Sequence, residues 1–418
     1  MTRAAPAPSG IDWARADSLS AEHGASFFLL DEALFRANYA AFQAAFAAHY
    51  PDVRIGYSYK TNYTPFLCRI IDELGGHAEV VSDMEYALAR RLGVAGDRII
   101  FNGPYKARAA FEEALLTGAT VNLDSLRDVE MLEAIAPAHP GHDFALVIRC
   151  NFHLGGAKDS GGGVSRFGMD PDGPEFAHAL EVLEHLSNAR LKGLHCHFPD
   201  RDLDSFGRRA KAMAALMHRL FPDEPPELVN IGGGYFSNMP EALRQSFGVP
   251  PATFADYGAL VGGILTRAVA GYRRPPALFL EPGTALVADV QTFYTRVLST
   301  RTVHGRNVAS VAGSIFDISP TARSTKLPVT ILGQGGGVAG AWDLGGYTCI
   351  EGDLLSLGLE AAIAPGDFAV FNNVGSYSVV MRPPFILPAN PILARTTAGE
   401  IITVKRRETI DDVFRNYV

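Results

Sequence analysis

Eight short, apolar, β-rich runs recur between residues 53 and 283, and this repetition constrains the fold more than any other feature of the sequence. Segments of about ten to eighteen residues with helical periodicity separate them, as expected of repeated βα units. The runs are VRIGYSY (53–59), HAEVVS (77–82), RIIFNG (98–103), TVNLD (120–124), FALVIRC (144–150), LKGLHCH (191–197), ELVNIG (227–232) and ALFLEPG (277–283). Eight parallel strands close a (β/α)8 barrel, so the sequence predicts an α/β protein whose larger unit is such a barrel.

The pattern changes after about residue 286. Short β-rich runs (TFYTRVL, PVTIL, FAVFN and IITVKR), interrupted by Gly and Pro, replace the βα units. Strand-like runs without long helices between them predict an antiparallel β domain. We therefore expect the barrel to be followed by a β domain that occupies the C-terminal part of the chain.

Composition and charge narrow the class of function. The chain of 418 residues carries a formal net charge of −8 and no basic run, which disfavours nucleic acid or an anionic membrane as a partner. No apolar stretch approaches a membrane span, and the N-terminal MTRAAPAPSG lacks the apolar core of a secretory signal, so we expect a cytoplasmic protein. The four cysteines match neither a disulfide framework nor a zinc site and are expected to be free thiols.

Polar residues cluster at the predicted C-terminal ends of the strands, where barrel enzymes carry their chemistry. They are Lys60, Glu79, Ser82, Asn102, Arg149, His195, His197, Gly232, Gly233, Gly234 and Glu281. The glycine triplet forms either a tight turn or a cradle in which backbone N–H groups approach a phosphate. A lysine beside such a cradle, an acid and an imidazole match the needs of pyridoxal 5'-phosphate (PLP): a Schiff-base amine, a phosphate anchor and a carboxylate for the pyridine nitrogen.

His195 and His197 raise the alternative of a metal site. Residues two apart on a strand point to the same face, which would also suit a metal pair. No suitably placed carboxylate or third histidine stands out, so we expect no metal.

Motifs along nearly the whole chain resemble the fold-type III PLP-dependent decarboxylases, the family of diaminopimelate and ornithine decarboxylases, which share the alanine racemase-type barrel. The matching motifs are FFLLDEALFRANY, YSYKTN, AEVVSDMEY, SRFGMD, GLHCH, NIGGGY, EPG, YTCIEGD, GSY and VKRRETIDDVF. The resemblance implies a PLP-binding barrel of residues 31–285 and a β domain of residues 286–418 that also includes residues 1–30. It further implies a homodimer with shared active sites, in which the Cys349 loop completes the partner's site.

The resemblance also assigns roles to residues. Lys60 would bind the cofactor, Glu281 would pair with the pyridine nitrogen, and His197 would stack on the ring. Cys349 would return a proton to Cα after CO2 is lost. The implied cofactor-binding residues are Lys60, Glu79, Arg149, His197, Gly232, Gly233, Gly234, Glu281 and Tyr377, and the implied substrate-binding residues are Arg323, Glu351 and Tyr377.

Several positions depart from the family's pattern for the distal end of the substrate. Diaminopimelate decarboxylases use an arginine after EPG and an Arg-Pro…Tyr segment, and here those places hold Thr284, Ser319 with Pro320, and Arg323. Ornithine decarboxylases use two aspartates, whose places hold Ala312 and Ile350. A substrate whose distal charged group finds no partner in the site is strongly disfavoured. We therefore expect decarboxylation of a non-standard or conjugated amino acid rather than of ornithine or meso-diaminopimelate.

The phosphate site departs from the pattern as well. The serine of the family's HIGS motif is missing because HFPD places Pro199 and Asp200 there. An aspartate beside a phosphate is repulsive, so the phosphate site must be partly rebuilt. Two alternatives stay open beside the decarboxylase: a PLP-dependent racemase or epimerase, and a catalytically silent regulatory homologue.

Overall fold

The computed structural model describes residues 10–154, 165–245, 247 and 251–418. It divides into two compact units. The barrel unit takes in residues 38–236 and 251–285, and the β unit takes in the described residues of 1–37, 237–250 and 286–418. One division between the units falls within helix α2 (Glu32–Ala47).

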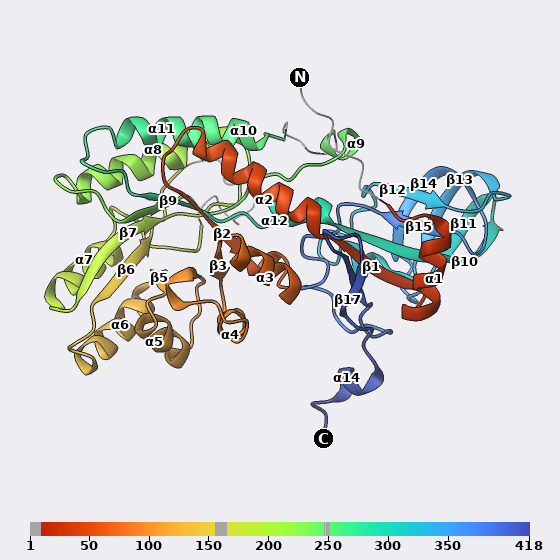
Figure 1. Ribbon diagram of the computed structural model, residues 1–418, viewed down its shortest axis with the longest axis horizontal. Coiled ribbons are helices and arrows are strands. Elements are labelled where there is room, and N and C mark those ends of the chain that lie inside the picture. Colours follow the sequence, from red (N-terminus) through yellow and green to blue (C-terminus); the bar gives the residue numbers. More distant parts are fainter. Residues whose placement is uncertain (1–9, 155–164, 246, 248–250) are drawn as a thin grey trace. The chain divides into compact units, whose positions relative to one another are not determined.

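Eight parallel strands of the barrel unit close on themselves in sequence order (Figure 1). They are β2 (Val53–Ser58), β3 (His77–Val80), β4 (Ile99–Phe101), β5 (Thr120–Leu123), β6 (Phe144–Arg149), β7 (Ala189–His195), β8 (Leu228–Asn230) and β9 (Ala277–Leu280). Each strand coincides or overlaps with one of the eight runs, which confirms the predicted (β/α)8 barrel. Apolar side chains fill its interior, among them Ile100, Val147, Leu228, Ala277 and Phe279.

Helices connect the barrel strands and cover their outer face (Figure 1). They are α3 (Pro65–Glu73), α4 (Asp83–Arg91), α5 (Arg108–Leu116), α6 (Leu126–Ile135), α7 (Pro174–His185), α8 (Leu203–Leu220), α10 (Phe254–Tyr257) and α11 (Gly263–Ala268), with α12 (Thr284–Val287) after β9. Ser82 caps α4 by accepting a hydrogen bond from the backbone N–H of Glu85, because the first turn of a helix leaves its N–H groups without intrahelical acceptors. The Glu85 side chain in turn accepts from the backbone N–H of Val81.

A nine-stranded sheet forms the β unit. Its strands are β1 (Ser26–Asp31), β10 (Gln291–Val303), β11 (Arg306–Val311), β12 (Val329–Leu332), β13 (Val338–Gly345), β14 (Leu354–Ile363), β15 (Phe368–Phe371), β16 (Ile392–Arg395) and β17 (Ile401–Lys405). β1 pairs with β10, so the N-terminal segment joins the C-terminal strands, as predicted. Most pairs are antiparallel, but β1 with β16 and β11 with β13 are parallel, so the sheet is mixed rather than purely antiparallel.

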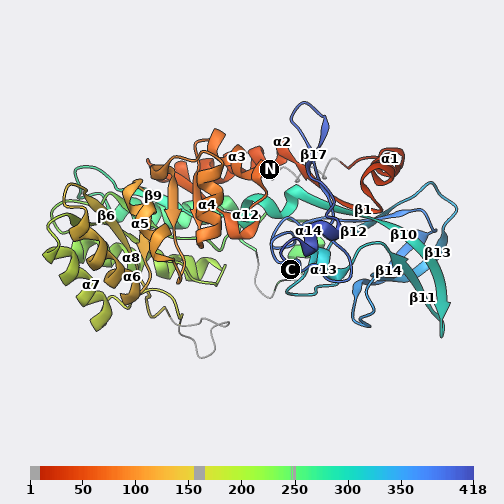
Figure 2. The ribbon, with the colours of Figure 1, turned by 90° about the horizontal axis from the view of Figure 1, so that it is seen from below.

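Short helices accompany this sheet (Figure 2). They are α1 (Trp13–His23), α9 (Glu241–Arg244), α13 (Ile315–Ile318) and α14 (Ile410–Phe414). α1 begins at the N-cap Asp12, whose side chain accepts from the backbone N–H of Arg15. Ala16 and Leu19 of this helix belong to an apolar cluster with Phe27 and Leu29 of β1. Burial of such side chains stabilises the fold by roughly 25 cal/mol per Å² of apolar surface.

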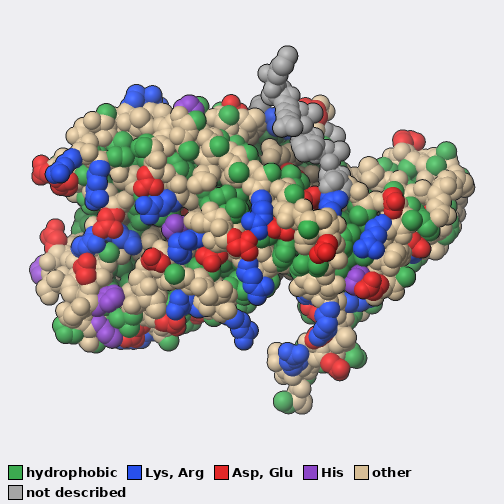
Figure 3. Space-filling model, in the orientation of Figure 1, with side chains coloured by type: hydrophobic (Ala, Val, Ile, Leu, Met, Phe, Trp, Pro, Cys, Tyr) green, Lys and Arg blue, Asp and Glu red, His purple; other side chains and the backbone are tan. Residues whose placement is uncertain are grey.

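Charged side chains of both signs are interspersed among those drawn in colour on the face shown in Figure 3. No helix within the described ranges is both long and apolar enough to span a membrane.

Candidate active site

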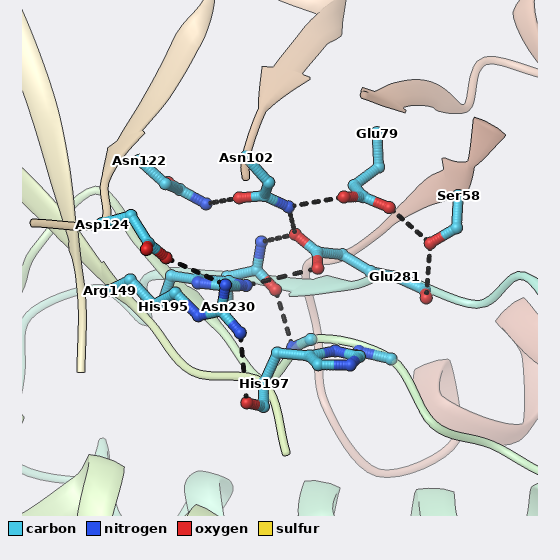
Figure 4. Close-up of polar contacts among 12 residues, drawn as sticks. Ser58, Glu79, Asn102, Asn122, Asp124, Arg149, His195, His197, Asn230 and Glu281 are labelled. Atoms are coloured by element: carbon cyan, nitrogen blue, oxygen red, sulfur yellow. Dashed lines mark hydrogen bonds and ion pairs between the residues drawn. The ribbon is translucent and has the colours of Figure 1, made fainter. Parts of the chain in front are cut away.

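A polar cluster lies at the C-terminal ends of the barrel strands (Figure 4). Parallel strands in a closed barrel bring these ends together, although the residues are far apart in the sequence. The cluster consists of Ser58, Lys60, Glu79, Asn102, Asn122, Asp124, Arg149, His195, His197, Asn230 and Glu281. It includes the predicted barrel residues that carry charge or an imidazole.

Lys60 lies in a short 3-10 turn (Tyr59–Thr61) directly after β2. Its Nζ is 2.6 Å from Oε2 of Glu79, and the hydroxyl of Ser58 donates to the same oxygen at 2.5 Å. The Glu79 side chain is fully buried, whereas a third of the Lys60 side chain is exposed. The lysine is therefore held at the rim by a buried carboxylate while part of its side chain stays exposed.

Glu281 follows β9 and is almost fully buried. Its Oε1 accepts hydrogen bonds from the side-chain amides of Asn102 (2.9 Å) and Asn230 (2.7 Å), and its Oε2 lies 3.3 Å from Nε2 of His195. Burial alone would raise the pKa of this carboxyl, but His195, Lys60 and Asn102 outweigh it and hold the pKa of Glu281 below its usual range. Glu281 is therefore a buried carboxylate that keeps its charge.

Asn102 joins the two carboxylates of the cluster. Its amide nitrogen donates to Glu79 Oε1 at 2.8 Å and to Glu281 Oε1 at 2.9 Å. Its carbonyl oxygen accepts from the amide of Asn122, which fixes the direction in which the amide points. One neutral side chain thus separates and orients two buried anions.

Arg149 ends β6 and is almost fully buried. It donates from a terminal nitrogen to Asp124 at 2.9 Å, and its guanidinium lies 4.8 Å from the ring centroid of Phe167. A second, longer hydrogen bond reaches the backbone oxygen of His197 at 3.5 Å. The arginine therefore packs beneath the segment that carries the predicted ring-stacking histidine.

His197 lies two residues beyond the end of β7, and its partners differ from those of His195. Its Nδ1 accepts a hydrogen bond from the backbone N–H of Gly233 at 2.9 Å. Burial, followed by the positive charges of Arg149 and Lys60, holds the pKa of His197 well below its usual range. The ring is therefore neutral, with its proton on Nε2.

The glycine triplet forms a close-packed turn after β8. Gly232 and Gly234 have φ values of 72° and 100°, which favour glycine. A Cβ on Gly233 would lie 2.4 Å from the backbone oxygen of Glu281, so no side chain fits there. Among the described residues, the N–H groups of Gly234 and Tyr235 have no hydrogen-bond acceptor. The turn can therefore present free N–H groups to an anion.

The other predicted site residues belong to the β unit. Cys349 and Glu351 lie in the turn between β13 and β14, and both are exposed. Arg323 and Tyr377 have positive φ values of 46° and 62°, and Arg323 lies over the ring of Phe316 at 4.9 Å. The roles of these four residues stay predictions.

Sequence reasoning missed several members of the cluster. The motifs do not predict Ser58, Asn122, Asp124 and Asn230 as site residues, and they predict Asn102 only as a polar residue at the rim. A signal was available, because each is a polar residue at the end of an otherwise apolar strand. Residues expected to point into a barrel are apolar unless they bind something.

A closed barrel with a rim lysine, a buried carboxylate and a glycine turn with free N–H groups defines an enzyme of the PLP-binding barrel class. The chain belongs to the pyridoxal-dependent decarboxylase family, whose pyridoxal-binding domain matches residues 34–288. The donor set fits PLP: Lys60 offers the amine, Glu281 an ionised partner for the pyridine nitrogen, and Gly232–Gly234 a turn for the phosphate. PLP is the cofactor of this family.

Similar proteins agree with this assignment. A diaminopimelate decarboxylase from Methanothermobacter thermautotrophicus is 24% identical over 97% of this chain and 94% of its own length. An L-glutamyl-[BtrI acyl-carrier protein] decarboxylase from Niallia circulans is 25% identical over 96% of both chains. The crystal structure of a diaminopimelate decarboxylase from M. jannaschii has the same fold, with a TM-score of 0.85 and 20% identity over 96% of this chain and 94% of that one.

Proposed function

We propose that this protein removes the α-carboxylate of a non-standard or conjugated amino acid. The observation that carries the proposal is the Glu281 site, in which His195, Asn102 and Asn230 keep a buried carboxylate ionised. Such a carboxylate holds a proton on a pyridine nitrogen, and a protonated ring is the stronger electron sink. This arrangement favours decarboxylation over the racemisation alternative.

The residues of the barrel act around the bound cofactor. PLP, when bound, supplies the electron sink for the pair left behind by departing CO2. Lys60 would attach the cofactor through its amine, and Glu79 would hold the free ammonium, since the two groups already form an ion pair. His197, neutral and fixed by Gly233, offers a flat face for the ring.

The β unit supplies the remaining groups in this proposal. We assign Cys349 the return of a proton to Cα, and Arg323, Glu351 and Tyr377 the binding of the substrate, with Tyr377 also contacting the cofactor. The working unit is a cytoplasmic homodimer in which the Cys349 turn completes the partner's site. The exposure of Cys349 supports this assignment, because a thiol that serves another subunit must be accessible in its own.

The charged side chains that the family uses at three positions are absent here, and their absence narrows the range of possible substrates. Thr284, Ala312 and Ile350 cannot supply the charges that bind a distal carboxylate or ammonium. A distal group that is linked to something else needs no such charge. One relative is named for a glutamyl group attached to an acyl-carrier protein, which supports a conjugated amino acid as the substrate.

A panel assay of CO2 release tests the proposal. The panel holds meso-diaminopimelate, L-ornithine, L-lysine, L-glutamate, amino acids linked through a side-chain carboxyl as thioesters to a carrier protein, and carboxylated polyamines, each in L and D forms where both exist. We expect the highest kcat/KM for a conjugated or non-standard member, with ornithine and diaminopimelate lower by several powers of ten. A best kcat/KM for either of those two would overturn the proposal. Chiral analysis of recovered substrate identifies a racemase, and turnover of no substrate by PLP-loaded protein identifies a silent homologue.

A further inference from the structure

Arg209 is a buried arginine whose contacts converge on the glycine turn. It lies on α8 and is fully buried. Its guanidinium donates to the backbone oxygens of Gly233 (3.2 Å) and Asp200 (2.7 Å), and to the hydroxyl of Ser205 (3.0 Å). It therefore links the loop after β7 to the loop after β8 from below.

The Arg209 guanidinium donates to no carboxylate in the described part of the chain, because its hydrogen bond to Asp200 goes to the backbone oxygen. All three acceptors are neutral, its Nε has no acceptor among the described residues, and its face packs 3.9 Å from the ring centroid of Phe206. Burying an arginine without a directly bonded anion is costly, and a guanidinium does not escape the cost by losing its proton. A site that retains such a charge is electrostatically prepared for an anion.

One of the two loops that Arg209 joins, the loop after β7, is where the family's phosphate contact has changed. Pro199 and Asp200 take the place of the HIGS serine there. The N–H groups of Gly234 and Tyr235 remain without acceptors in the described structure. The turn thus keeps its donors, whereas Asp200, which replaces an uncharged residue in the loop after β7, carries a negative charge.

We propose that Arg209 restores the phosphate site of this protein. Its buried positive charge offsets Asp200 and stabilises the phosphate dianion at the glycine turn, and its hydrogen bonds to Gly233 and Asp200 set the spacing of the two loops. Arg209 is a positioning residue, because its contacts are with the loops and not with the reacting atoms. The inference rests on PLP binding and is independent of the identity of the substrate.

A comparison of two ligands tests this role. Apo-protein of the full chain is titrated with PLP and with pyridoxal, which lacks the phosphate, and the Kd of each is read from the absorbance of the bound ligand. Arg209→Gln is expected to weaken PLP about 10- to 100-fold, the size expected for a hydrogen-bonded charge, and to leave pyridoxal nearly unchanged. Arg209→Lys, which keeps the charge, is expected to lose less than about tenfold.

Two further variants make the result decisive. Arg208→Gln changes the neighbouring arginine, which is partly exposed and pairs with Asp204, and should leave both Kd values unchanged. Asp200→Asn removes the repulsive charge from a partly exposed position and should tighten PLP about 3- to 10-fold, but not pyridoxal. Equal weakening of PLP and pyridoxal by Arg209→Gln, or no weakening of either, would overturn the proposal. If Arg209→Gln does not fold, an unchanged ratio of the two Kd values in Arg209→Lys and Asp200→Asn overturns it.

Discussion

His195 and Glu281 face each other across 3.3 Å inside the barrel, between Nε2 of the ring and Oε2 of the carboxylate. Both side chains are almost fully buried, and a carboxylate can only accept, so the ring donates. Nδ1 of His195 has no hydrogen-bond partner among the described residues. The hydrogen bond from Nε2 to Glu281 is therefore the contact that orients the ring. The pair fixes the charge that the cofactor ring meets.

Glu281→Gln should lower kcat while PLP still binds. The glutamine removes the negative charge, and its amide nitrogen must face either His195 or the two asparagine amides, all of which donate. We expect kcat to fall by about 10²- to 10³-fold, the usual loss when a preorganised electrostatic contact is removed. Single-turnover CO2 release, with bound PLP quantified by absorbance, measures the effect. Glu175→Gln, on the exposed start of α7, is the control, and a fall of less than about threefold in Glu281→Gln would contradict the assigned role.

Lys60→Ala should abolish turnover without unfolding the protein. The lysine lies at the rim, and Glu79 keeps hydrogen bonds from Ser58 and Asn102 after its removal. PLP should then bind without the borohydride-reducible link to the chain. Circular dichroism and thermal melting check the fold, and Lys211→Ala on the exposed face of α8 is the control. Near-normal CO2 release by Lys60→Ala would rule out the proposed mechanism.

A mixture of inactive variants tests the shared sites. Lys60→Ala and Cys349→Ala each disable both sites of a homodimer, but in a mixed dimer one site receives both changes and the other receives neither. Random exchange makes about half the dimers mixed, so equal amounts should regain roughly a quarter of wild-type activity. Mild denaturation and refolding enforce the exchange. Activity no higher than the mean of the two parents would show that Cys349 acts within its own chain.

Glu85 should make stability fall as pH rises. Burial raises the pKa of Glu85 to about 7, opposed by the N–H of Val81 and reinforced by Glu79. The folded state binds this proton more tightly than the unfolded chain, so the favourable contribution is full below about pH 4.5 and is lost as pH rises through about 7. Between pH 5 and 8 the free energy of unfolding should drop by about 1 to 3 kcal/mol more in wild type than in Glu85→Gln. Urea titrations across this range measure it, and an equal pH dependence in both proteins would refute it.

Much of the barrel could be predicted because its signal is local. Each strand is a short apolar run bounded by turn residues, and a chain with eight such units in succession has few ways to bury them other than closure. The β unit was harder, since the parallel pairing of β1 with β16 and of β11 with β13 depends on strands far apart in the sequence. Its mixed character therefore differed from the antiparallel expectation.

The sequence by itself determined the barrel, the lysine after the first barrel strand and the carboxylate after the last, because strand periodicity and position along the chain specify them. Only the tertiary structure decided how the charges are arranged. Closure of the barrel brings Asn102 between Glu79 and Glu281. It also pairs His195 with Glu281, and it lets Gly233 donate to His197 and accept from Arg209. Hydrogen bonds and ionisation depend on distances of a few ångströms between distant residues, and no local pattern encodes those distances.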